Sequence, residues 1–173
     1  MTVRANKPAF SIREKLKGLD YAHVPYDKMP AGSVIQTSSF VLSGSQPNTT
    51  SSSLTPSGLK VTIYPHFSNS KIYVIANPVA RAYNSAGANA EAVFAVYRNG
   101  TLIKRGQHRS YDYGGSGSIL DVNIALTYLD SPNTTSSVEY EVYIALNAGT
   151  RVEVNPSTST DISTITVMEI RQW

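Results

Sequence analysis

Residues 119–146 read ILDVNIALTYL (119–129), DSPNTTSS (130–137) and VEYEVYIAL (138–146), and they decide the predicted fold. In the first and third segments apolar and polar side chains alternate with a period of two, which is typical of β-strands with one buried face. The middle segment contains Pro132 and Asn133 and indicates a polar turn. We therefore expect a central hairpin whose two strands form the core of a β-sandwich. The side chains expected on its buried face are Leu120, Val122, Ile124, Leu126, Tyr128, Val138, Tyr140, Val142, Ile144 and Leu146.

The rest of the body continues this pattern of alternating strands. Asn99-Gly100 is a strong signal for a hairpin turn, and Pro78 interrupts a long apolar strand, which indicates an edge or a bulge. Polar loops are expected at 43–57 and 106–117. No strand–helix–strand spacing is present, so we expect antiparallel sheets of about eight strands, an all-β jelly-roll sandwich. The remaining strands are expected at 33–42, 59–64, 71–83, 90–98, 101–104, 151–154 and 163–170.

Bulk composition excludes several classes of protein. The chain has 173 residues, which is enough for one domain with a hydrophobic core. It contains no cysteine, so it has neither disulfides nor thiolate metal sites. No apolar run approaches the roughly 18 residues that a membrane-spanning helix needs, so no membrane partner is expected.

Positive charge is concentrated at the start of the chain. The first thirty residues contain six basic and three acidic residues, a net charge of +3, whereas the remainder contains nine of each. A nucleic-acid-binding domain typically carries its basic patch on the folded body, so no direct contact with nucleic acid is expected. The six basic residues are Arg4, Lys7, Arg13, Lys15, Lys17 and Lys28.

Residues 1–30 are therefore expected to form an N-terminal arm, followed by the sandwich over 31–173. Ser11 and Glu14 fit a capping box and Gly18 a helix stop, which predicts one short helix near 11–18. So short a helix is marginal alone and needs a surface. The arm either folds back over its own domain or binds another subunit or protein, and its separate charge favours the second. The residues expected to make that contact are Arg4, Lys7, Phe10, Ile12, Arg13, Lys15, Leu16, Tyr21 and Tyr26.

The sequence offers little evidence for catalysis. Glu139 and Glu141 lie two residues apart on one strand face, and paired carboxylates hydrolyse glycosides, but alternating charges also mark an ordinary solvated face. The histidines His23, His66 and His108 lack metal-ligand spacing. We therefore expect no enzyme activity, no metal site and no cofactor.

Two further sets of residues are candidates for contacts. The Gly- and Tyr-rich segment 106–117 carries His108, Arg109, Tyr111 and Tyr113 and is a candidate surface for glycan recognition. The last strand, 163–170, is apolar on both faces, which indicates either a locally thick core or a strand between the core and a neighbouring subunit. The residues assigned to that subunit interface are Met168, Ile170 and Trp173.

Four stretches resemble a family of small virion proteins of tailed bacteriophages, frequent in phages of aquatic bacteria. They are MPAGSVIQ (29–36), RNGTLI (98–103), LDSPNTT (129–135, before Tyr140 and Val142) and STITVMEI (163–170). The resemblance covers residues 29–170. Relatives often have a longer Asn-Arg-Ser-Asp segment where this chain has the short 155–158, so the resemblance assigns no role to that loop.

The resemblance implies a trimeric jelly roll displayed on a virion. Its expected partners are further copies of itself and the major capsid protein, as in a decoration (cement) protein on the outer surface of the head. The alternative is a host-receptor or glycan-binding domain of a tail fibre or baseplate, located at the tail. The decoration role is favoured because the chain has a compact basic arm and no fibre stalk.

Overall fold

The computed structural model describes residues 25–86, 89–110 and 117–173. Within these ranges the backbone forms antiparallel β-strands and one short 3-10 helix, η1 (Tyr26–Lys28). No helix in these ranges has the length and apolar character needed to cross a membrane. The strands are β1 (Val34–Leu42), β2 (Asn48–Thr49), β3 (Thr55–Ile63), β4 (Lys71–Asn77), β5 (Val79–Asn84), β6 (Ala90–Arg98), β7 (Thr101–Ser110), β8 (Ser118–Asn123), β9 (Leu126–Asp130), β10 (Val138–Ala148), β11 (Arg151–Val154) and β12 (Ser163–Ile170).

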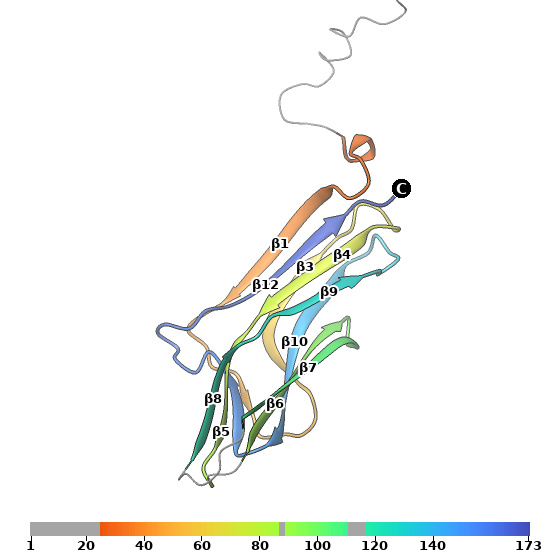
Figure 1. Ribbon diagram of the computed structural model, residues 1–173. Helices are drawn as coiled ribbons and strands as arrows, with labels where there is room; N and C mark the ends of the chain where they lie inside the picture. Colours follow the sequence, from red (N-terminus) through yellow and green to blue (C-terminus); the bar gives the residue numbers. More distant parts are fainter. Residues whose placement is uncertain (1–24, 87–88, 111–116) are drawn as a thin grey trace, which may run out of the picture.

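The strand order is that of a jelly roll. Sheet A has the order β1-β12-β4-β9, sheet B β2-β11-β5-β8 and sheet C β3-β10-β6-β7. Sheet B continues sheet A, since β4 leads into β5 and β8 leads into β9 (Figure 1). Counting each of these pairs as one bent strand, and leaving aside the short β2 and β11, gives eight strands in two sheets of order 1-8-3-6 and 2-7-4-5. The predicted all-β sandwich is confirmed.

The bend between sheets A and B lies at Pro78. Proline has no amide hydrogen, so the ladder must break there. The backbone nitrogen of Ile124 donates to the carbonyl oxygen of Pro78 at 3.1 Å, at the point where β8 ends and β9 has not begun. The two bent strands, β4–β5 and β8–β9, therefore both pass between sheets A and B beside Pro78. The sequence predicted only an edge or a bulge at this position.

The predicted central hairpin is wrong. β9 pairs with β4, whereas β10 pairs with β3 and β6, so residues 131–137 cross from sheet A to sheet C. The first segment is also two strands rather than one. Tyr128 lies near the open edge of sheet A and is 37% exposed, in contrast to its predicted place in the core. The second segment follows the prediction, because Val138 and every alternate residue of β10 through Leu146 is buried.

Two predicted loops contain strands. Within 43–57 the chain forms β2 and the start of β3. Ser57 is buried, and its hydroxyl is satisfied by donating a hydrogen bond to the carbonyl oxygen of Val142 at 2.7 Å. β7 continues to Ser110, so His108 and Arg109 lie on a strand rather than in a loop. The Asn99-Gly100 hairpin is confirmed.

Candidate functional site

Residues 25–33, here called the arm root, are attached to the body at one end of the sandwich. The ring of Tyr26 contacts the ring of His66, with centroids 4.2 Å apart. The guanidinium of Arg171, which follows β12, donates to the carbonyl oxygen of Tyr26. The other predicted arm contacts lie outside the described residues: Arg4, Lys7, Phe10, Ile12, Arg13, Lys15, Leu16 and Tyr21, with the predicted helix near 11–18.

Backbone hydrogen bonds join the segment before β1 to the segment after β12. The nitrogen of Gly32 donates to the carbonyl oxygen of Arg171, and the nitrogen of Arg171 donates to the carbonyl oxygen of Ser33, both at 2.9 Å. The guanidinium of Arg171 also lies over the ring of Phe67, 4.8 Å from its centroid. Because β1 and β12 are antiparallel neighbours, the arm root and the end of β12 emerge together (Figure 1).

A buried carboxylate lies directly beneath the arm root. Glu169 has no exposed surface. Its oxygens accept hydrogen bonds from the backbone nitrogens of His66 (2.9 and 3.0 Å) and Phe67 (3.2 Å) and from the side-chain nitrogen of Gln36 (2.7 Å). The Nδ1 atom of His66 lies 3.1 Å from one of the same oxygens. Glu169 therefore holds the loop on which Tyr26 rests.

The hydrogen bonds keep this carboxylate ionised. Burial alone would raise the pKa of Glu169, but the hydrogen bonds from Gln36 and His66 help to outweigh burial, and the pKa is lowered below its ordinary value. We did not anticipate this group from the sequence. The signal was present, because alternation along β12 places Glu169 on the same inward face as Ile165 and Val167.

Asp130 joins the two sheets across the sandwich. This buried residue accepts a hydrogen bond from the hydroxyl of Tyr140 at 2.7 Å and two from Arg98 at 2.9 and 3.0 Å. Burial and the neighbouring Asp130 carboxylate raise the pKa of the Tyr140 hydroxyl, which therefore remains a donor. All four stretches that carry the resemblance thus supply structural contacts: 98–103 and 129–135 meet at Asp130, and Gln36 of 29–36 donates to Glu169 of 163–170.

The predicted glycan-recognition residues are used within the fold where the structure describes them. Arg109 donates from Nε and Nη2 to the two carboxylate oxygens of buried Glu91, both at 2.8 Å, and lowers the pKa of Glu91. The ring of His108 packs edge-on against Phe94, with centroids 6.2 Å apart. Tyr111 and Tyr113 lie outside the described residues. Arg109 therefore joins β6 to β7, and its side chain remains 43% exposed.

Each of the two strand glutamates, Glu139 and Glu141, has a partner on the neighbouring strand β3. Glu139 lies 3.0 Å from the ammonium of Lys60, and Glu141 accepts a hydrogen bond from the backbone nitrogen of Gly58 at 3.1 Å. Burial raises the pKa of Glu141. Each carboxylate thus has its own partner on sheet C. Among the described residues no three His, Cys, Asp or Glu side chains are grouped to hold a metal ion.

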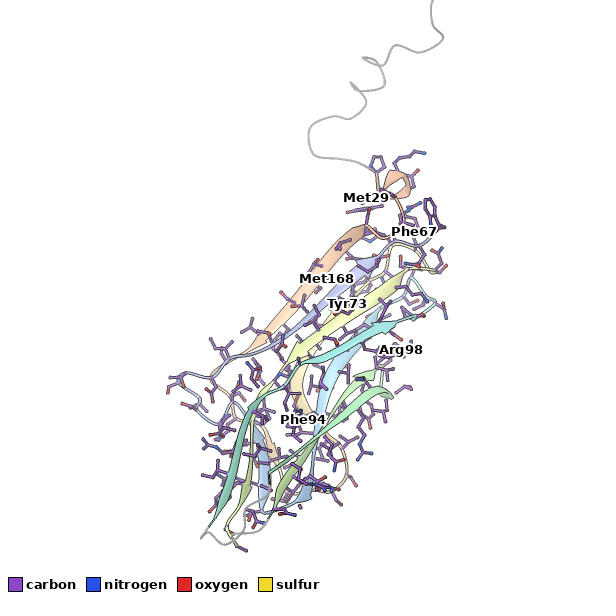
Figure 2. All side chains as sticks on the ribbon, in the orientation of Figure 1. Met29, Phe67, Tyr73, Phe94, Arg98 and Met168 are labelled. Atoms are coloured by element: carbon purple, nitrogen blue, oxygen red, sulfur yellow. The ribbon has the colours of Figure 1, made fainter. Side chains whose placement is uncertain are left out.

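The last strand has two apolar faces, as predicted. Ile165 and Val167 are buried in the core, whereas Met168 and Ile170 are half-buried on the outer face of sheet A. Figure 2 labels Met168 beside Tyr73 of the neighbouring strand β4. Trp173 is 96% exposed, and its carbonyl oxygen accepts a hydrogen bond from the side chain of Asn69.

No protein-family profile and no curated protein matches the sequence. Similar solved structures include dimeric latent PorU from Porphyromonas gingivalis, with 9% identity, a TM-score of 0.32, and coverage of 83% of this chain and 14% of that one. The Gt strain of infectious bursal disease virus has 9% identity and a TM-score of 0.34, covering 81% of this chain and 39% of that one. The VP2 subviral particle of the same virus has 12% identity and a TM-score of 0.35, covering 80% and 38%. The chain thus spans well under half of each structure, and such low TM-scores carry no argument about function.

Proposed function

We propose that the protein is a structural component of a bacteriophage virion, a trimeric capsid decoration (cement) protein. Its N-terminal arm binds the outer face of the head and stabilises it against internal pressure. The observation that carries this proposal is the set of contacts at the arm root. There Tyr26 contacts His66 and Arg171 beside the buried Glu169. A basic segment that leaves a rigid body from a fixed place is suited to anchoring that body on another surface.

The distribution of charge supports the arm as the anchoring element. Residues 1–24 contain five basic and two acidic residues, a net charge of +3, which equals that of the whole chain. Several basic side chains of the body pair internally: Arg81 with Asp121 (2.6 Å), Arg98 with Asp130 (2.9 Å) and Arg151 with Glu153 (2.9 Å). An acidic partner surface would therefore be attracted mainly to the arm.

A homotrimer would strengthen such anchoring. Each arm of about thirty residues offers only local contacts, but three arms on one particle act at high effective concentration once the first has bound. The jelly-roll body is the rigid part that holds the arms together. The major capsid protein is the partner that this arrangement requires.

The test uses heads from which the protein has been removed. Full-length protein and a variant lacking residues 1–24 are mixed with the heads and sedimented. We expect the full chain to co-sediment and the truncated chain to remain in solution with an unchanged β-sheet circular dichroism spectrum, because every core residue lies after Val34. Equal co-sedimentation of both proteins would refute the arm as the anchor.

The position of the protein on intact virions separates decoration from the alternative function. Density at regular lattice positions in a reconstruction of the particle is the expected result. Density at the tail tip would instead favour a host-receptor or glycan-binding domain of a tail fibre or baseplate.

A further inference from the structure

The outer face of sheet A consists of rows of side chains that cross its four strands. The strand register places Thr37, Met168, Tyr73 and Leu129 in one row. Adjacent rows contribute Ile75 and Ile170 on the same face. Leu129 is 54% exposed, and Figure 2 shows Met168 and Tyr73 labelled on neighbouring strands. The face therefore combines a cluster of apolar side chains with neutral polar ones, among them Thr37, Thr166 and Thr127.

This face differs from the outer faces of the other two sheets in its charge. Among the outward-facing residues of β1, β12, β4 and β9, Lys71 alone is charged, and its ammonium donates to the hydroxyl of Ser131 at 2.5 Å. Sheets B and C instead carry cross-strand ion pairs on their outer faces, such as Arg81 with Asp121 and Lys60 with Glu139. Few charges together with Met and Tyr are typical of the centre of a protein–protein interface.

The size of the face suits self-association. Four strands about 4.8 Å apart and eight residues rising about 3.3 Å each cover roughly 19 by 26 Å, or about 500 Å² on each copy. In a trimer each copy shares this face between its two neighbours, so three faces bury about 1,500 Å² in total. A neutral face also meets its own copies without like-charge repulsion, whereas a charged partner would find almost nothing to pair with.

We propose that the outer face of sheet A is where copies of this chain pack against one another, with sheet A of each subunit turned toward a threefold axis. The trimeric count rests on the proposed function. Met168 and Ile170 belong to this surface, and Tyr73, Ile75 and Leu129 extend it across β4 and β9. A threefold axis along the strands brings the three arm roots out on the same side, where they bind one surface together.

The mass of the purified full-length chain tests this proposal without capsids. Sedimentation velocity is expected to give three times 18.7 kDa, about 56 kDa. Tyr73→Lys places a charge at the centre of the face and is expected to yield the 18.7 kDa monomer. The matched control is Tyr143→Lys, because Tyr143 is also a half-buried tyrosine but lies on the outer face of sheet C, stacked on Tyr97. A monomeric wild type, a trimeric Tyr73→Lys or an equally dissociated control would overturn the proposal.

Cross-linking provides a second measurement that does not depend on a disruptive charge. The chain has no native cysteine, so Met168→Cys introduces a single thiol on the face. A short bis-maleimide is expected to join subunits of Met168→Cys but not of Thr62→Cys, whose thiol lies on sheet C. Equal cross-linking of both variants counts against this face. A trimer that fails to bind heads refutes decoration alone, and a monomer that still binds heads refutes the interface alone.

Discussion

At the scale of single residues, Glu169 is the group on which the arm root most depends. It accepts hydrogen bonds from two backbone amides and from Gln36 in a site without solvent. Glu169→Gln removes the charge and turns an amide group toward these donors. We expect the free energy of unfolding to fall by about 2 kcal/mol at pH 7 in urea titrations, because buried donors lose a charged acceptor.

A surface glutamate is the control for this substitution. Glu139 pairs with Lys60 on the outer face of sheet C, and exposed ion pairs contribute little to stability. Glu139→Gln should therefore shift the urea midpoint far less than Glu169→Gln. Equal shifts would mean that the network beneath the arm root has no special role.

The pH dependence of stability follows from the same carboxylate. The pKa of Glu169 in the folded protein is lowered below its ordinary value of 4.5. A carboxylate with a lowered pKa stabilises the fold above its unfolded-state pKa, and this stabilisation is lost as the pH falls through the folded-state pKa. The difference in unfolding free energy between wild type and Glu169→Gln should thus be constant above pH 4.5 and shrink below it. A difference that stays the same down to pH 3 or so would contradict this.

At the scale of elements, local pattern predicted the strands but not their partners. Alternation identified the buried face of β10, and Asn99-Gly100 identified the β6–β7 turn, because both signals lie within a few residues. The polar sequence of residues 130–137 is compatible with a hairpin within one sheet and equally with a crossing to the other sheet. Its crossing depends on the pairing of β9 with β4 and of β10 with β3, which are distant in sequence.

Two glycine turns allow a prediction about elements. Gly100 has φ +77° with open space at the Cβ position, so Gly100→Ala should cost about 1 kcal/mol of backbone strain. Gly149 has φ +116°, and a Cβ there would lie 2.8 Å from the carbonyl oxygen of Tyr83. Gly149→Ala should therefore lower the melting temperature clearly more than Gly100→Ala. Similar melting temperatures would show that the turn at Gly149 shifts freely.

The candidate site was only partly visible in the sequence. Composition alone placed the net positive charge in residues 1–30, because charge does not depend on folding. The contact of Tyr26 with His66 and the ion pair of Arg109 with Glu91 depend on tertiary packing. From the sequence alone Arg109 was interpreted only as a recognition residue, because its pairing with Glu91 on the neighbouring strand cannot be predicted from local pattern.

At the scale of the whole molecule, charge separation between arm and body predicts a salt effect. Screening shortens from about 8 Å at physiological ionic strength to about 3 Å at 1 M salt. Binding to heads should weaken steadily over this range. The double substitution Arg13→Gln/Lys15→Gln should weaken binding at low salt and flatten the salt dependence.

The matched control removes the same two charges from the body. Lys104 and Arg105 are adjacent exposed residues of β7. Lys104→Gln/Arg105→Gln should leave both the affinity for heads and its salt dependence close to wild type. If the two double variants behave alike, the total charge of the molecule rather than its arm governs binding.

The pairing of β1 with β12 also has a mechanical consequence. β1 begins and β12 ends at the arm root, where Gly32 and Arg171 are hydrogen-bonded. Tension that pulls the arm away from the segment after β12 acts along the inter-strand hydrogen bonds and loads those at this end first, so it opens them one after another. Under this load β1 would separate from β12 progressively, starting at Val34. It would not slide along β12 with all of the hydrogen bonds breaking at once.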